Sequence, residues 1–163
     1  MKLDRYDLAI LRILAHDGRI TKSRLAEEIN LSISPAWERV KRLEEGGVIR
    51  GYRADIDWVA AFKGSRVVVE VTLARHTAHD MRRFEERVAR APQVVQCHAT
   101  GGGVDYVMHV MSRDIDHYQR FIDSLLGDEL SIEKYFTYIV TKVVKSGVEE
   151  LPDWAQESIG DGA

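Results

Sequence analysis

The side chains best suited to chemistry lie between positions 22 and 42, where bases and hydroxyls recur at helical spacing. Guanidinium groups match the O6/N7 acceptor pair of guanine, while lysines, serines and helix N-termini position phosphates. We expect Arg39 and Arg42 to share an exposed helix face, flanked by Lys41. The residues predicted to contact duplex DNA are Lys22, Ser32, Ser34, Trp37, Glu38, Arg39, Lys41 and Arg42.

This surface also has simpler explanations. A three-helix packing unit whose charged face is only solvated produces the same pattern. Trp37 suits the edge of a core, and Glu38 either accepts a hydrogen bond from cytosine N4 or pairs with Arg42 four residues later. Arg50 and Arg53 follow the same helix and are placed to reach the flanking phosphates.

A glycine-rich stretch at positions 100–106 is the second candidate site. Three successive glycines allow close backbone approach and offer exposed N–H groups to a carboxylate, while Asp105 is suited to an ammonium group. Together they match a zwitterion. The alternative is a hairpin turn without a ligand, in which Asp105 only caps the turn. The predicted effector-binding residues are Thr100, Gly101, Gly102, Gly103, Val104, Asp105 and Tyr106.

Other reactive residues do not assemble into a recognisable site. Cys97 and His98 are adjacent on a predicted strand and therefore point to opposite faces, so they cannot chelate one ion together. The pair His76 and His79 lacks the ligand number of a zinc site. No nucleophile motif is present. We expect no catalytic residues, no metal and no cofactor.

The first third of the chain must position the DNA-reading surface, and its pattern is helical. Asp4 and Thr21 are expected N-caps, and Asp17 with Gly18 ends the first helix. The Ser34-Pro35 pair predicts a third helix that starts with Ser34 as N-cap and runs to position 45. Residues 48–53 alternate weakly, which indicates a short strand or wing, and residues 58–62 form a single turn.

The second part of the chain changes to a period of two. Its predicted order is β-α-β-β-α-β, the ferredoxin-like pattern, with Asp114 and Asp116 as caps of its second helix. The strands are expected at residues 66–73, 94–100, 105–111 and 132–144, and the helices at 79–91 and 116–126. The predicted divisions are a helix-turn-helix domain at 1–53, a linker at 54–64, an α+β domain at 65–145 and an acidic tail at 146–163.

Composition sets the limits of these interpretations. Hydrophobic residues make up 45% of the 163 positions, enough for two small cores. The longest apolar run is five residues, so we expect no membrane span and no membrane partner. One cysteine and a charged N-terminus fit the cytoplasm. The net charge of −3 hides a basic start and a tail with five acids and no base.

The sequence from residue 3 to about 145 resembles the Lrp/AsnC family of transcriptional regulators. The resemblance rests on Leu3-Asp4-Arg5, Asp17-Gly18-Arg19, Leu25-Ala26, Leu31-Ser32, Glu38-Arg39-Val40, Arg42-Leu43-Glu44, Gly47-Val48-Ile49 and Gly51-Tyr52. It implies a winged helix-turn-helix domain followed by a βαββαβ domain that binds amino acids and dimerises through its sheet. The family's effector loop resembles Gly-Asp-x-Asp-Tyr and lies between dimers. Here Gly102, Val104, Asp105 and Tyr106 match that loop, whereas Gly103 replaces its first acid.

These observations predict a DNA-binding transcriptional regulator of the metabolism of amino acids or their derivatives, controlled by a small amino acid-like effector. The resemblance also implies self-association as a dimer and, further, as an octamer of four dimers. The alternative is a ferredoxin-like ligand-binding module or enzyme that carries a helical appendage without DNA-binding activity.

Overall fold

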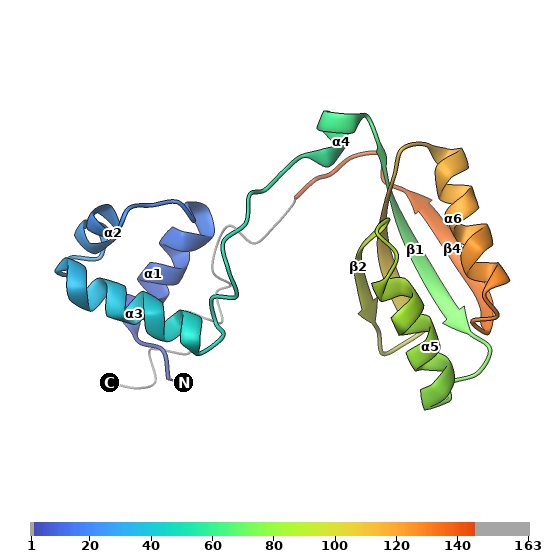
Figure 1. The fold of residues 1–163 in the computed structure, drawn as a ribbon, viewed down its shortest axis with the longest axis horizontal. Coiled ribbons are helices and arrows are strands. Elements are labelled where there is room, and N and C mark those ends of the chain that lie inside the picture. Colours follow the sequence, from blue (N-terminus) through green and yellow to red (C-terminus); the bar gives the residue numbers. More distant parts are fainter. Residues whose placement is uncertain (1, 146–163) are drawn as a thin grey trace. The chain divides into compact units, whose positions relative to one another are not determined.

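The computed structural model describes residues 2–145, which form two compact units. The helical unit comprises the described residues up to Asp55, and the α+β unit spans Ile56–Val144. Figure 1 shows the three helices of the first unit and the helix-backed sheet of the second. The 146–163 tail expected from the sequence lies outside the described residues.

Three helices enclose the core of the helical unit. They are α1 (Arg5–His16), α2 (Lys22–Glu28) and α3 (Ile33–Glu45). Their apolar residues recur every three to four positions, so each helix presents one stripe to the others. The buried side chains are Ile10, Leu25, Ala26, Ile29, Ala36, Val40 and Leu43.

Two of the three helices in this unit begin at the N-cap residue that the sequence predicts. The Asp4 side chain accepts hydrogen bonds from the amides of Tyr6 and Asp7, and Thr21 accepts one from Arg24, as expected. The third prediction was wrong, because α3 begins two residues earlier, with Ser32 in place of Ser34 as N-cap. Pro35 is therefore the third helical residue. Its missing N–H costs nothing there, since the first four amides of a helix have no intrahelical partner.

Of the two forms expected for residues 48–53, a short strand or a wing, the strand is not formed within the described chain. This segment leaves α3 through turns that bond the amides of Val48 and Ile49 to the carbonyl of Leu43, and then continues as an extended chain. A strand needs a partner for its backbone groups, and the helical unit offers no neighbouring strand. Tyr52 instead hydrogen-bonds to Glu44 on α3.

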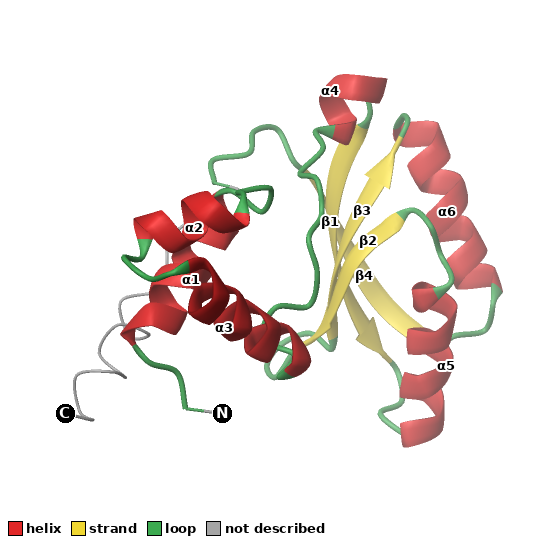
Figure 2. Ribbon diagram, turned by 60° about the vertical axis from the view of Figure 1, so that its left-hand side comes forward, coloured by secondary structure: helices red, strands yellow, loops and turns green. Residues whose placement is uncertain are grey.

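The α+β unit is a four-stranded antiparallel sheet in the order β2-β3-β1-β4. Figure 2 shows both long helices on the same side of this sheet. The β-α-β-β-α-β order predicted from the sequence is confirmed. Its elements are β1 (Ser65–Leu73), α5 (Ala78–Ala89), β2 (Val94–Ala99), β3 (Tyr106–Ser112), α6 (Ile115–Gly127) and β4 (Ile132–Ile139), preceded by the single-turn α4 (Trp58–Phe62).

Alternating burial along β1 and β3 places one set of side chains under the helices. The helices pack onto that set to form the core. From the two strands it contains Val67, Val69, Val71, Leu73, Tyr106, Met108 and Val110, and from the helices Phe84, Val88, Phe121, Ile122 and Leu125. Asp114 caps α6 as predicted, accepting a hydrogen bond from the amide of His117. Asp116 instead lies within the first turn.

The last strand is shorter than the predicted 132–144. β4 ends at Ile139, which pairs with Val67, and the amide of Val140 makes a final bond to the carbonyl of Arg66. Only Ser65 of β1 lies beyond this point, so β4 has no strand left to pair with. Gly64 precedes β1, and a Cβ atom there would lie 2.8 Å from the Ser112 carbonyl oxygen, which excludes larger residues. Among the described residues, no helix is long and apolar enough to span a bilayer.

Candidate functional site

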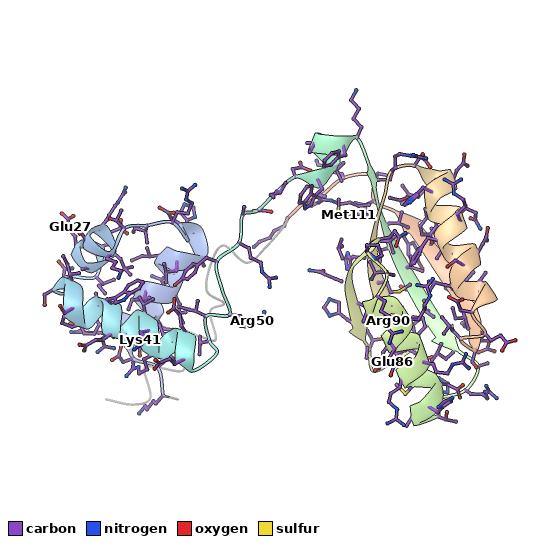
Figure 3. The ribbon with its side chains drawn as sticks, in the orientation of Figure 1. Glu27, Lys41, Arg50, Glu86, Arg90 and Met111 are labelled. Atoms are coloured by element: carbon purple, nitrogen blue, oxygen red, sulfur yellow. The ribbon has the colours of Figure 1, made fainter. Side chains whose placement is uncertain are left out.

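The exposed face of α3 carries four of the residues predicted to read DNA, and a fifth lies next to it on α2. Ser34, Trp37, Glu38 and Lys41 are all exposed, and Lys22 at the start of α2 joins them. The Lys22 ammonium lies 3.7 Å from the centroid of the Trp37 ring, a cation–π contact that links the two helices at the surface. Figure 3 marks Lys41 on α3. We call these five exposed residues the α3 face.

Arg39 and Arg42 both bond to carboxylates near the start of α1, but they differ in exposure: the Arg39 side chain is only 25% exposed, whereas Arg42 is 49% exposed on α3, as expected. The Arg39 Nη1 atom donates to Asp4 Oδ2 at 2.7 Å and to Asp7 Oδ1 at 2.9 Å, and Arg42 Nη2 donates to Asp7 Oδ2 at 2.6 Å. Arg39 follows the buried Ala36 by three residues and therefore flanks the buried stripe. Both arginines connect α3 to the start of α1.

Asp7 is the centre of this ion-pair cluster. Its side chain is fully buried and accepts hydrogen bonds from both guanidinium groups and from the Asp4 amide. Burial acts to raise the pKa of Asp4, but the bonds from the Asp7 amide and Arg39 outweigh it and hold that pKa below its usual value. The bond to Asp4 likewise raises the pKa of Arg39. The cluster therefore joins the two helices through charged hydrogen bonds.

The other predicted DNA-reading residues of α3 are exposed and differ in their polar partners. The proposed Glu38–Arg42 pair is absent from the described chain, because Arg42 is engaged by Asp7. Ser32 and Ser34 lie exposed at the N-terminus of α3, where unpaired amides favour a phosphate. Lys41 lies 3.5 Å from Glu45 in a solvent-exposed pair that is weak enough to exchange for a phosphate.

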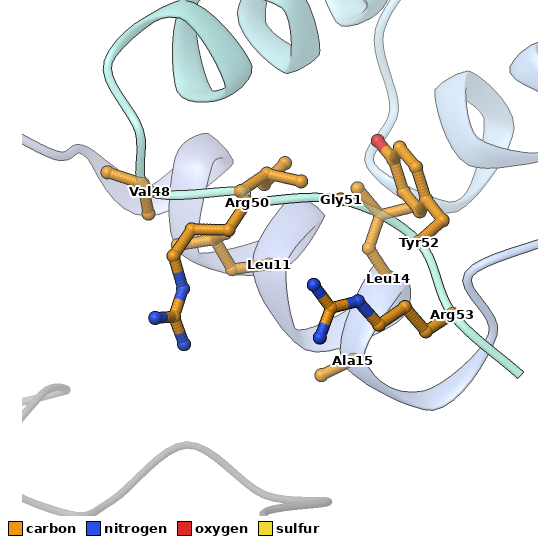
Figure 4. A pocket seen from close by; sticks show the side chains of 9 residues that line it. Leu11, Leu14, Ala15, Val48, Arg50, Gly51, Tyr52 and Arg53 are labelled. Atoms are coloured by element: carbon orange, nitrogen blue, oxygen red, sulfur yellow. The ribbon is translucent and has the colours of Figure 1, made fainter. Parts of the chain in front are cut away.

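A groove between α1 and the 48–53 segment was missed by the sequence analysis. It has a volume of about 470 Å³, with Leu11, Leu14, Ala15 and Val48 on its apolar floor. Figure 4 shows Arg50 and Arg53 projecting from the segment alongside α1. Burial beside Glu44 raises the pKa of Tyr52, at one end of the groove, to about 12. Only folding brings these two segments together, so no local pattern could have revealed the groove.

The second candidate site is the loop between β2 and β3, an exposed turn whose two ends are joined by hydrogen bonds. The Thr100 amide donates to the Asp105 carbonyl at 2.8 Å, and its hydroxyl donates to the Val104 carbonyl at 2.6 Å. Of its three glycines only Gly102 has positive φ, at 150°. A Cβ atom on Gly101, Gly102 or Gly103 would meet nothing within 4 Å, so the loop backbone is open to a ligand.

Asp105 connects this loop to the neighbouring strand. Its Oδ2 atom accepts a hydrogen bond from the Leu73 amide at 2.8 Å, and His76 Nε2 lies 3.0 Å from the same oxygen. Both partners of the Asp105 carboxylate lie outside the 100–106 loop, so the carboxylate bonds to the end of β1 and to His76. The Asp105 side chain remains 20% exposed, so a ligand can still reach it.

Tyr106 was predicted to bind the effector together with the loop, but its side chain is buried and does not lie on the loop surface. Its ring points under the helices, is 1% exposed and packs against Phe84 with 4.5 Å between ring centroids. The hydroxyl donates to Glu85 at 2.9 Å, and burial together with that carboxylate raises the pKa of Tyr106. Tyr106 is thus a core residue that also lines a depression of about 370 Å³ between α5 and β2.

The adjacent pair Cys97 and His98 behaves as the strand pattern predicts. Cys97 packs against the core and burial raises its pKa, whereas His98 is exposed on the opposite face. Within residues 2–145, no three histidine, cysteine or acidic side chains are grouped in a way that could hold a metal ion.

Two protein-family descriptions match the chain in order. The family described as winged helix-turn-helix DNA-binding matches residues 3–50. The family described as Lrp/AsnC ligand binding domain matches residues 66–149. The first contains the α3 face, and the second contains both the sheet and the 100–106 loop.

Named relatives agree with this assignment. The chain is 56% identical to the transcriptional regulatory protein DoeX of Halomonas elongata, over 89% of this chain and 92% of the relative. It is 42% identical to the Bkd operon transcriptional regulator of Pseudomonas aeruginosa, over 77% and 82% of the two chains.

Solved structures share the fold. An AsnC family transcriptional regulator from Agrobacterium tumefaciens is 33% identical, with a TM-score of 0.84 over 92% of this chain and 97% of that one. A Neisseria meningitidis regulator in complex with L-methionine is 27% identical, with a TM-score of 0.86 over 94% and 99%. The chain therefore belongs to the Lrp/AsnC family and is a transcriptional regulator with a winged helix-turn-helix domain and a ligand-binding domain.

Proposed function

We propose that this regulator reads duplex DNA with the α3 face and adjusts that binding to an amino acid-like effector. The observation that carries the proposal is the surface formed by Lys22, Trp37 and Lys41, which is exposed and linked across two helices. Its groups serve both kinds of contact, since lysines and serines hold phosphates while Glu38 can accept from a base.

The two arginines have a different role in this proposal. Arg39 is only 25% exposed and uses its guanidinium on two carboxylates, so it positions α3 rather than touching DNA. Arg42 is 49% exposed and keeps free N–H donors beyond its bond to Asp7, so it can reach a phosphate beside α3. Arg39 is thus a positioning residue, and Arg42 has both functions.

Lys41→Gln is expected to weaken binding to the gene's own upstream DNA about tenfold and to lower the salt slope by about one, as loss of one phosphate contact does. A gel-shift series at several salt concentrations measures both quantities. Lys142→Gln is the matched control, because it removes an exposed lysine from the other unit. Equal affinities for the two variants would contradict the assigned role of the α3 face.

The effector site is proposed at the 100–105 loop. Support comes from its open glycine backbone and from the carboxylate of Asp105 beside it. The Neisseria relative binds L-methionine, a zwitterion of the kind this loop suits. We place the effector's carboxylate on the glycine amides and its ammonium group at Asp105, with Tyr106 supporting the loop from the core.

Asp105→Asn should weaken effector binding by about 1.5–3 kcal/mol, the cost of losing a hydrogen bond to a charged group. The asparagine oxygen can still accept from the Leu73 amide, so the thermal stability of the free protein should change little. Calorimetry with the amino acid that binds the wild type measures the change, with exposed Asp116→Asn as control. A normal effector affinity together with a lowered melting temperature would instead assign Asp105 a purely structural role.

Self-association is proposed through the sheet face opposite the helices. Phe136 and Tyr138 on β4 are about half exposed there, and they pair with Glu70 and Val68 on β1. An apolar sheet face of this kind requires cover. We propose a dimer that assembles further into an octamer of four dimers. A stable monomer in light scattering at micromolar concentration would contradict this assembly.

The remaining properties follow from the proposed role. A regulator acts on the chromosome, so we place the protein in the cytoplasm, without a membrane partner. Effector binding and DNA binding are equilibria, so the proposal requires neither a catalytic residue nor a cofactor.

A further inference from the structure

The groove between α1 and the 48–53 segment has a floor and a rim of different chemistry. Leu11, Leu14, Ala15 and Val48 present apolar surface, while Arg50 and Arg53 stand at its edge (Figure 4). Of the ion pairs between residues 2–145, none involves Arg50 or Arg53. The groove therefore suits an apolar side chain flanked by carboxylates.

The end of this chain has that composition. Residues 146–163 contain five acids and no base. Leu151 and Trp154 supply two large apolar side chains, and Glu150 and Asp153 stand directly beside them. The pattern of acids next to apolar anchors complements a groove with an apolar floor and a basic rim.

Connectivity brings this segment within reach of the groove. The amide of Val140 bonds to the carbonyl of Arg66 at 2.9 Å. The linker that leads into β1 and the segment that follows β4 are therefore adjacent where they meet the sheet. Counting back from Arg66, 13 residues lead to Arg53, and counting forward from Val140, 14 lead to Trp154. The second span reaches about 45–50 Å when extended, and the first is shorter because it contains the single-turn α4. Trp154 can therefore reach Arg53 wherever the linker places the helical unit.

We propose that residues 148–157 of this chain bind intramolecularly in the groove, with Leu151 and Trp154 on its apolar floor. Glu149, Glu150 and Asp153 then face Arg50 and Arg53. Tethering gives the segment a millimolar effective concentration, so weak contacts suffice for binding. Because the segment covers the two arginines, it competes with DNA phosphates for them and lowers DNA affinity.

Disulfide cross-linking tests the contact without DNA. In a Cys97→Ser background, Ala15→Cys is placed on the groove floor and Ala155→Cys next to Trp154, so both apolar anchors remain. The control pairs Ala155→Cys with Ser23→Cys, an exposed position on α2. Oxidation in dilute solution, followed by mass spectrometry, reports each disulfide.

The groove pair should form an intramolecular disulfide about tenfold faster than the control pair, as expected for a tethered segment held at its partner. High salt, or the triple change Glu149→Gln, Glu150→Gln and Asp153→Asn, should remove that advantage. Equal rates for the two pairs, or disulfides that join two chains, would overturn the proposal.

The effect on DNA is measured separately, with the same triple variant in an otherwise unchanged chain. It should bind the upstream DNA several-fold more tightly than the wild type at low salt, because the arginines are uncovered. An unchanged affinity would overturn the competition with phosphates. Failure of the cross-link and failure of DNA binding itself remain distinguishable, since the first experiment contains no DNA.

Discussion

Asp7→Ala is expected to destabilise the helical unit by about 3–5 kcal/mol, because it removes the common partner of two partly buried arginines. The Asp7 side chain is fully buried and bonds to Arg39, Arg42 and the Asp4 amide. Its loss leaves Arg39 with the half-exposed Asp4 carboxylate as its one remaining partner in the cluster and removes the carboxylate that bonds to Arg42, so the connection between α1 and α3 is weakened. Most single substitutions lower the free energy of unfolding by less than this.

Hydrogen exchange measured by mass spectrometry reports this change within α1 and α3 alone, so the α+β unit serves as an internal standard. Glu45→Ala is the control, because its pair with Lys41 is exposed and contributes about 0–1 kcal/mol. Protection of α1 that is equal in the two variants would show that the cluster does not hold the helices together.

Tyr106→Ala should destabilise the α+β unit by about 3–5 kcal/mol, the usual cost of deleting a large buried ring. The ring is 1% exposed and lies against Phe84, so its removal leaves a cavity between the sheet and α5. Thermal unfolding measures the loss. Ile115→Ala, at a side chain that is 47% exposed, should change stability far less.

Tyr106→Phe separates the core role from a direct contact with the effector. The variant keeps the ring and loses only the hydroxyl bond to Glu85, which contributes about 0.5–1.5 kcal/mol. We expect unchanged effector affinity in calorimetry. A large loss of affinity in this variant would show that the hydroxyl touches the effector and that Tyr106 belongs to the site.

Local chemistry made much of this fold predictable from the sequence. Asp4, Thr21 and Asp114 cap helices because their side chains reach amides two or three residues ahead, which is a property of the local sequence. The order of strands and helices along the chain followed from β-branched alternation along β1 and from the spacing of the two helices. The end of β4 was misplaced because it depends on where its partner β1 begins.

The site was harder to predict, because its decisive contacts join distant residues. Arg39 bonds to Asp4, 35 positions earlier, and Asp105 bonds to the Leu73 amide, 32 positions earlier. Helical spacing placed Trp37 and Lys41 on the exposed face, but an arginine that flanks the buried stripe turns toward whichever carboxylate the fold supplies. The sequence pattern contains no information about that partner.

An equilibrium titration of the wild-type protein with its own upstream DNA, with and without each amino acid, tests the central claim most directly. We expect the logarithm of the binding constant to fall linearly with the logarithm of the salt concentration. We also expect at least one amino acid to shift the affinity about fivefold or more, the range of ordinary allosteric coupling. Binding that depends neither on salt nor on any amino acid would contradict an effector-controlled DNA-binding regulator.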